Sequence, residues 1–215
     1  MGALVERWWD TTNSFHFSAT GDMTMPPFDF VVLTGIDAGG WAIPYDEDMG
    51  QWEAAWIYLL GARPPVDRSS GRVRYNWFFS HFWRVEMEPE TPEEVAQYAR
   101  GFLMFLFGTT LFADRGNTVG LYLLSALVDL SQVRRYDCGG ASLATLYCYM
   151  SATSCGRGNI LGGYWRAWEV LSAPFDLHFF FHSLYTAHTV HFTFCSSVLS
   201  PQHAGGTICT QHSVF

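Results

Sequence analysis

Residues 98–117 read YARGFLMFLFGTTLFADRGN, and within them residues 102–113 are apolar apart from one glycine and two threonines. A membrane-spanning helix needs about 20 apolar residues, so this run is too short to cross a bilayer. The preceding Thr91, Pro92 and Glu94 have the pattern of a helix start: an N-cap hydroxyl, a proline at the first position and a glutamate that completes a capping box. The stretch therefore predicts a helix that enters the core of a soluble domain.

The composition predicts one folded domain. The chain has 215 residues, of which 49% are hydrophobic and 17% aromatic, enough for a sizeable core. Its formal net charge of −8 argues against free-standing nucleic-acid binding driven by charge, because such binding needs clustered cations. We also expect no membrane partner, because the apolar runs are short.

The chain contains no lysine, and all of its cationic side chains are arginine. Pyridoxal phosphate enzymes need a lysine amine, P-loop proteins need a glycine–lysine pair, and protein kinases need a strand lysine. These three classes are excluded for the chain acting alone, so we expect no enzyme and no cofactor.

The cysteine number is odd, at five, and no secretory signal pattern is visible. We therefore expect a reduced cytosolic or nuclear setting.

Apolar periodicity predicts a mainly α fold. Helices are predicted at residues 4–9, 28–34, 52–60, 73–83, 91–113, 118–130, 139–150 and 160–171, and a small N-terminal β-hairpin is predicted within residues 14–25. We assign residues 1–172 to a single helical domain and residues 173–215 to an irregular tail. Residues 177–215 carry no Asp, Glu, Lys or Arg but six of the eight histidines. Because charged residues make up about 25% of an average globular chain, this tail is not expected to belong to the domain.

The one basic stretch of the sequence lies in and after a predicted exposed loop over residues 62–72. Its arginines have aromatic neighbours, so they could contact phosphate while the rings stack on bases. The alternative is a solvated loop that neutralises an acidic protein. The candidate interaction surface consists of Arg63, Arg68, Arg72, Arg74, Tyr75 and Trp77.

Two groups of residues have the chemistry of metal ligands. The first is Asp46, Glu47, Asp48 and Glu53, which lacks the calcium-loop spacing and is better explained as acids that favour a helix N-terminus. The second is the tail set His188, His191, Cys195, His203, Cys209 and His212, which lacks a tight ligand pair. We therefore expect no metal, and a metal-dependent hydrolase is the last of three functional hypotheses.

The remaining polar residues are interpreted as structural. His16 and His81 are expected to be partly buried, and Asp114 and Arg115 are expected to cap adjoining helices or to pair across the turn. No Gly-x-Ser-x-Gly elbow or cysteine nucleophile signature supports covalent catalysis.

Five motifs, in order along the chain, resemble the plant mobile domain, also labelled aminotransferase-like, of the Maintenance of Meristems family. They are LVERWWDTTNSFHF at 4–17, GDMTM and FDFVVLTG within 21–35, YAR, LFAD and Asn117 within 98–117, YDCGGA and LATLY within 136–147, and GGYW and WE within 162–169. Cys138 stands where the family usually has Trp, which we expect to remove buried aromatic bulk. The chain starts late in the family pattern and leaves that pattern after about residue 170, so we expect an incomplete member.

The resemblance implies a mostly helical domain that occurs in plant transposable elements and in domesticated host proteins. It implies a nuclear location and roles in meristem maintenance, genome stability and transposon silencing, with nuclear proteins as partners. Some relatives fuse the domain to a phosphatase domain, which we do not expect in this chain. The family supplies no catalytic residues, and the label aminotransferase-like implies no activity here, because the required lysine is missing. Nucleic-acid binding through residues 63–74 is the second hypothesis.

Overall fold

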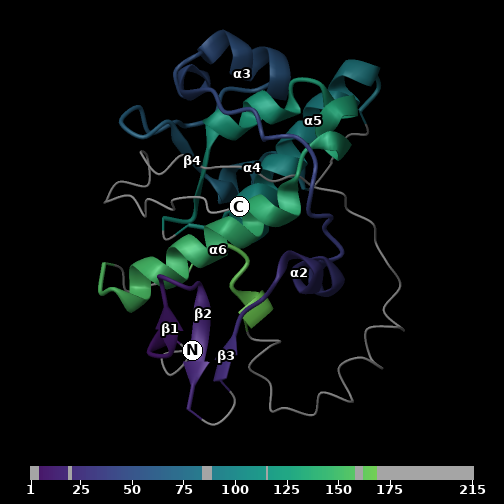
Figure 1. Cartoon of the computed structure of the whole chain (residues 1–215). Coiled ribbons are helices and arrows are strands. Elements are labelled where there is room, and N and C mark those ends of the chain that lie inside the picture. The colour runs from purple at the N-terminus through teal and green to yellow at the C-terminus, as the bar shows by residue number, and fades with distance from the viewer. Residues whose placement is uncertain (1–4, 19–20, 84–88, 115, 158–161, 169–215) are drawn as a thin grey trace. The chain divides into compact units, whose positions relative to one another are not determined.

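The computed structural model describes residues 5–18, 21–83, 89–114, 116–157 and 162–168, and the chain divides into two compact units (Figure 1). Unit 1 combines Met1–Ala42 with Arg135–Phe215, and unit 2 is Ile43–Arg134. Helices predominate among the described elements and the sheets are small, so the predicted mainly α fold is confirmed. The predicted tail, residues 173–215, lies outside the described residues.

Unit 1 begins with a three-stranded antiparallel sheet of β1 (Trp8–Trp9), β2 (Ser14–Phe17) and β3 (Gly21–Met23). The predicted hairpin is therefore joined by an additional strand, and the prediction of a helix at residues 4–9 was wrong at Trp8 and Trp9. Trp8 pairs with Phe15 in the sheet. Strand geometry places successive side chains on opposite faces, which leaves Trp8 4% exposed and Trp9 55% exposed. Burial of Trp8 against Phe15, with ring centroids 4.9 Å apart, favours the strand over the helix.

Two helices complete unit 1, and α6 packs beside β1 (Figure 1). The helix α2 (Pro27–Thr34) has a proline in its first turn and ends at Gly35, whose φ of 68° is the left-handed conformation that glycine adopts without strain. The helix α6 (Cys138–Ser154) begins where the Asp137 side chain accepts a hydrogen bond from the Gly140 amide. The shared core consists of Trp8, Phe15, Met25, Phe30, Leu143, Leu146, Met150, Ala167 and Trp168.

Two details of unit 1 bear on the sequence predictions. Cys138, which replaces the tryptophan usual in the resembled family, is fully buried, as expected for a position that normally holds aromatic bulk. Of the helix predicted at residues 160–171, the structure describes residues 162–168, which contain a helical turn at 166–168. The rest of that segment lies outside the described residues.

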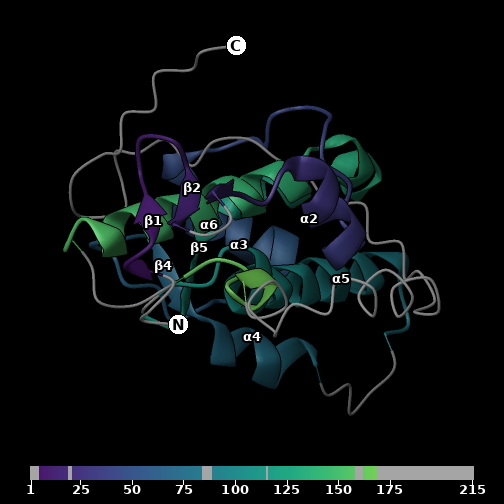
Figure 2. The same ribbon diagram turned by 60° about the horizontal axis from the view of Figure 1, so that its bottom comes forward.

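The helix α5 (Pro92–Leu106) is the centre of unit 2, and α4 (Tyr75–Phe82) packs along it (Figure 2). The predicted capping box is confirmed: the Glu94 amide donates to the Thr91 hydroxyl at 3.2 Å, and the Thr91 amide donates to Glu94 Oε2 at 3.0 Å. Beyond Leu106 the chain continues as a π-helical turn, η2 (Phe107–Leu111). No helix among the described residues is long and apolar enough to cross a membrane.

Shorter elements surround α5 in unit 2: η1 (Glu47–Gly50), α3 (Glu53–Leu60), β4 (Arg72–Arg74), β5 (Thr118–Gly120) and η3 (Leu121–Leu127). A further 3₁₀ segment, η4 (Leu130–Arg135), follows η3 in the chain. The helix α3 ends at Gly61, another left-handed glycine, as its sequence predicts.

Two sequence predictions in unit 2 need correction. The helix predicted from residue 73 begins at Tyr75, because Val73 pairs with Val119 between β4 and β5 and both valines are buried. The helix predicted at residues 118–130 is instead strand β5 followed by the 3₁₀ helix η3. A 3₁₀ helix has three residues per turn, so side chains three apart lie on one edge. Leu121, Leu124 and Leu127 have that spacing and all three are fully buried.

Candidate functional site

The six residues of the candidate interaction surface do not lie on one exposed loop. Arg72 and Arg74 belong to β4, and Tyr75 and Trp77 belong to α4. The prediction of an exposed loop was therefore wrong at its C-terminal end, where pairing of β4 with β5 extends the chain into a strand. Arg63 forms an ion pair with Glu53, so its charge is already neutralised within unit 2.

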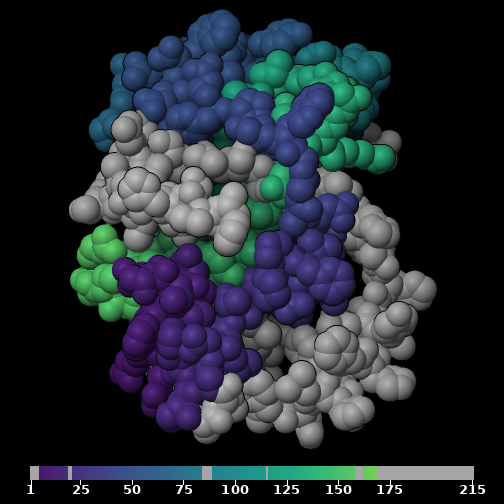
Figure 3. All heavy atoms as spheres, in the orientation of Figure 1, coloured from purple at the N-terminus to yellow at the C-terminus, as the bar shows by residue number. Residues whose placement is uncertain are grey.

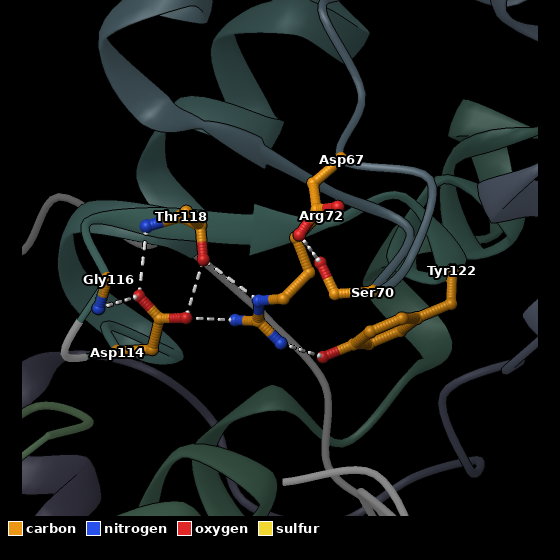
Figure 4. A network of polar contacts seen from close by, with 7 residues as sticks. All are labelled: Asp67, Ser70, Arg72, Asp114, Gly116, Thr118 and Tyr122. Carbon is orange, nitrogen blue, oxygen red and sulfur yellow. Dashed lines mark hydrogen bonds and ion pairs between the residues drawn. The ribbon is translucent and has the colours of Figure 1, made fainter. Parts of the chain in front are cut away.

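Arg72 is held in a polar network within unit 2 (Figure 4). Its guanidinium donates to Asp114 Oδ2 at 2.5 Å, to Thr118 Oγ1 at 2.8 Å and to the Tyr122 hydroxyl at 3.2 Å. Asp114 also accepts hydrogen bonds from the amides of Gly116 and Thr118 at 3.0 and 2.9 Å. Because its donors are engaged inside the protein, Arg72 is not positioned to bind an external phosphate.

Asp114 was predicted to cap a helix or to pair across its own turn. Its carboxylate instead accepts from amides in the turn before strand β5 and pairs with Arg72 of β4, which is distant in sequence. Arg115, the other residue of that prediction, lies outside the described residues.

At the far side of the network the Tyr45 ring packs on Tyr122 with centroids 4.6 Å apart. Burial, with the charges of Tyr122 and Glu47, raises the pKa of Tyr45 to about 12. The Tyr45 hydroxyl is therefore neutral at physiological pH.

Replacing Asp114 with Asn is expected to lower the free energy of unfolding by about 1–3 kcal/mol, because the Arg72 charge loses its partner and half of the carboxylate becomes a donor. Urea titration of the purified chain measures this loss. The control is Asp129→Asn, with an expected change within about 0.5 kcal/mol. Asp129 is exposed and accepts from the amide and the hydroxyl of Ser131 in its own turn, at 2.9 and 2.7 Å. Equal effects of the two substitutions would contradict a special role for the Arg72–Asp114 pair.

Arg68 and Arg74 are the exposed cations that remain in the candidate surface, and neither forms an ion pair among the residues that the structure describes. Tyr75 and Trp77 are half-buried. The Trp77 ring stacks on His81 with centroids 4.3 Å apart and also contacts Phe78 edge-on. The stretch therefore offers two available arginines rather than four. Its aromatic rings already have partners, since Trp77 packs on other rings of α4 and Tyr75 contacts Phe105 of α5 edge-on.

A second surface, missed by the sequence reasoning, lies on α3 and is called here the α3 face. It consists of Ile57 and Tyr58 of α3 and of Trp52, the N-cap residue just before that helix, which are 51%, 67% and 58% exposed. Figure 3 shows the chain segment around α3, in blue, at the surface of unit 2. Ala55, Trp56, Leu59 and Leu60 form the buried side of the same helix. The signal was present in the sequence, because a helix that is apolar all round has more apolar surface than one core contact can cover.

The acidic group Asp46, Glu47, Asp48 and Glu53, interpreted from the sequence as acids that favour a helix N-terminus, includes residues with structural partners. Asp46 accepts from the Asp48 amide at 3.0 Å and so caps η1, while Glu53 pairs with Arg63. In the described ranges, no group of three or more His, Cys, Asp or Glu side chains is placed to hold a metal ion. The histidines and cysteines of the tail lie outside those ranges.

The two histidines of the N-terminal half differ in burial. His16 is partly buried as predicted, and its Nδ1 lies 2.7 Å from Asp22 Oδ1 across the β2–β3 pair. His81 is exposed, so the prediction of partial burial was wrong for it. The reason is its position on the outer side of α4, where Phe78 and Phe82 occupy the buried side.

These features describe a mainly α domain with ordered sequence motifs and an exposed aromatic helix face. A family model described as plant mobile domain matches residues 1–175, and the chain belongs to the plant mobile domain family. Over 168 residues it is 30% identical to Protein MAINTENANCE OF MERISTEMS of Arabidopsis thaliana, an alignment that covers 76% of this chain and 34% of that protein.

Two further relatives from Arabidopsis thaliana illustrate the range of proteins that contain such a segment. The chain is 32% identical over 149 residues to Protein MAIN-LIKE 2, covering 68% of this chain and 22% of the relative. It is 33% identical over 180 residues to a protein named Serine/threonine-protein phosphatase 7 long form homolog, covering 79% of this chain and 13% of the relative. The chain thus spans about a third or less of these relatives. No solved structure matches it.

Proposed function

We propose that the chain is a non-enzymatic nuclear module that binds proteins, and that it acts in meristem maintenance, genome stability and transposon silencing. The observation that carries the binding role is the α3 face, with Ile57 and Tyr58 exposed on one short helix and Trp52 exposed at its N-cap. The names of two relatives, MAINTENANCE OF MERISTEMS and MAIN-LIKE 2, support the developmental role. The phosphatase in the name of a third relative belongs to that longer protein.

The physical case for protein binding is the cost of leaving large apolar groups in water. Burial of apolar surface is favourable by about 25 cal/mol per Å², and aromatic side chains supply large contact areas with few rotamers to fix. Tryptophan and tyrosine are also enriched among the residues that dominate binding energy at protein interfaces. The α3 face carries one of each beside an isoleucine, so it has the composition of an interface centre.

The double substitution Ile57→Ser with Tyr58→Ser is expected to abolish capture of specific proteins from a plant nuclear extract, because it removes the apolar area of the α3 face. The matched control is Phe28→Ser in unit 1, an aromatic side chain that is even more exposed, at 75%, and this substitution should leave capture unchanged. Circular dichroism checks that all variants are folded. Failure of the folded wild-type chain to capture any specific protein, or equal capture by the double variant, would contradict the proposal.

Nucleic-acid binding is the second candidate function, and the observation in its favour is that Arg68 and Arg74 are exposed without ion-pair partners among the described residues. If these two arginines contact phosphate, affinity for single-stranded RNA or DNA falls steeply with salt, with a slope of about −0.7 per phosphate contact in logarithmic units. Arg68→Ala with Arg74→Ala should remove the binding and the slope. Binding that is insensitive to salt, or that survives the double substitution, would rule out this site.

A further inference from the structure

The turn that leads into β4 contains two exposed serines, Ser69 and Ser70, between Arg68 and Arg72. The Asp67 amide donates to the Arg72 carbonyl at 2.9 Å, and the Asp67 carbonyl accepts from the amides of Ser70 and Gly71 at 3.2 and 2.8 Å. These bonds close the turn but leave its tip in solvent. A short exposed turn held by a few hydrogen bonds opens at low free-energy cost, as a segment must when an enzyme modifies it.

Both serine hydroxyls donate to the Asp67 carboxylate, Ser69 to Oδ1 and Ser70 to Oδ2, each at 2.7 Å. Hydrogen bonds from Ser70 and then Ser69 lower the pKa of Asp67, so the carboxylate is ionised at neutral pH. Figure 4 shows this Asp67–Ser70 pair together with the Arg72 side chain and its network. The serines therefore lie close in sequence and in space to an arginine that holds the β4–β5 pair together.

We propose that Ser70 is a phosphorylation site for an arginine-directed serine/threonine kinase, and that the phosphate draws Arg72 away from Asp114. Kinases select substrates by charge pattern, and Ser70 has arginine at both the second preceding and the second following position. In the reaction the Ser70 Oγ attacks the γ-phosphorus of ATP, the Oγ–P bond forms, and the bond to ADP breaks. The serine proton passes to the catalytic base of the kinase. This inference does not depend on the proposed protein-binding role.

The consequence follows from charge. A phosphoserine carries about −1.5 to −2 charges at pH 7 and donates no hydrogen bond, so it cannot keep the position of a hydroxyl 2.7 Å from the Asp67 carboxylate. Repulsion from Asp67 opens the turn, while Arg68 and Arg72 attract the phosphate. Each shift of Arg72 toward the phosphate weakens its contact with Asp114, which orders the amides of Gly116 and Thr118.

The modification is tested with the purified full chain, an arginine-directed kinase and magnesium ATP, followed by tandem mass spectrometry. Phosphate is expected on Ser70 and is expected to be lost in Ser70→Ala and in Arg68→Ala. The matched serine is Ser131, also exposed and also donating its hydroxyl to a nearby aspartate at 2.7 Å, but with its nearest arginine three positions later. Ser131→Ala should keep the phosphate. No phosphate on Ser70, or equal incorporation in Ser70→Ala, would overturn the site.

The coupling to Arg72 has its own measurement, hydrogen exchange at the amides of Gly116 and Thr118. Phosphorylated chain is expected to exchange there about fivefold to thirtyfold faster than unmodified chain, the range that a loss of one or two kcal/mol produces. Ser70→Ala treated with the same kinase should exchange like the untreated wild type. Phosphate on Ser70 with unchanged exchange at both amides would overturn the displacement of Arg72 from Asp114.

Discussion

Replacing Arg100 with alanine is expected to lower the free energy of unfolding by about 3–5 kcal/mol, because hydrogen bonds to a buried charged group are among the costliest to remove. Arg100 lies in α5 and is 7% exposed. Its guanidinium donates to the carbonyl oxygens of Leu127 at 3.0 Å and of Leu59 and Val128 at 3.3 Å. One side chain thus joins α5 to the last turn of α3 and to the end of η3, and its truncation leaves these carbonyls without their donor.

Urea titration followed by circular dichroism measures the loss, and Arg74→Ala is the matched control. Arg74 is exposed and has no ion-pair partner among the described residues, so its substitution should change stability by no more than about 0.5 kcal/mol. The loss of stability in Arg100→Lys should fall between the losses in Arg100→Ala and Arg74→Ala. An ammonium keeps the charge but lacks the planar guanidinium that reaches three acceptors. A change below about 1 kcal/mol for Arg100→Ala would show that the carbonyls find other donors.

Local signals in the sequence were sufficient for three of the helix ends of this fold. The Thr91 capping box and the glycines at positions 35 and 61 mark boundaries that the structure reproduces, since each depends on residues close in the chain. The strand at Trp8 could not be predicted in the same way. Its burial depends on Phe15 and on Trp168, with ring centroids 4.9 and 5.6 Å from Trp8, and the second contact joins opposite ends of the described chain.

The charges of the candidate interaction surface could not be predicted from local sequence either. Four arginines within residues 63–74 look like one basic patch when charges are counted along the chain. Arg72 is neutralised by Asp114, which lies 42 residues away in sequence, and the partner of Arg63 is Glu53 in α3. Arg100 was noticed only as part of a family motif. Beside its ion pair with Glu93 at 3.7 Å, nothing in the local sequence shows that its guanidinium donates to backbone carbonyls of α3 and η3. Ion pairs between residues far apart in sequence decide which charges remain available to a binding partner, and the spacing of residues along the chain does not reveal these pairs.

Gly101→Ala is expected to destabilise unit 2 by about 1–3 kcal/mol, the usual cost of adding a methyl group to a packed core. Helix propensity predicts the opposite sign, since alanine is favoured over glycine in a helix by about 1 kcal/mol. The steric term wins because a Cβ at position 101 would overlap the ring of Phe82, a buried side chain of α4. The helices α4 and α5 pack against each other at this glycine, so a side chain there separates them.

A double-mutant cycle with Phe82→Ala separates the steric effect of the added methyl group from the effect of helix propensity. In the Phe82→Ala background the ring is absent, so Gly101→Ala should become neutral or stabilising by up to about 1 kcal/mol. Phe82→Ala alone should cost about 3–5 kcal/mol through lost burial and the cavity that it leaves. Urea titration of the four chains gives the coupling energy. If Gly101→Ala were equally destabilising with and without the ring, the glycine would be required for a reason other than close approach of α4 to α5.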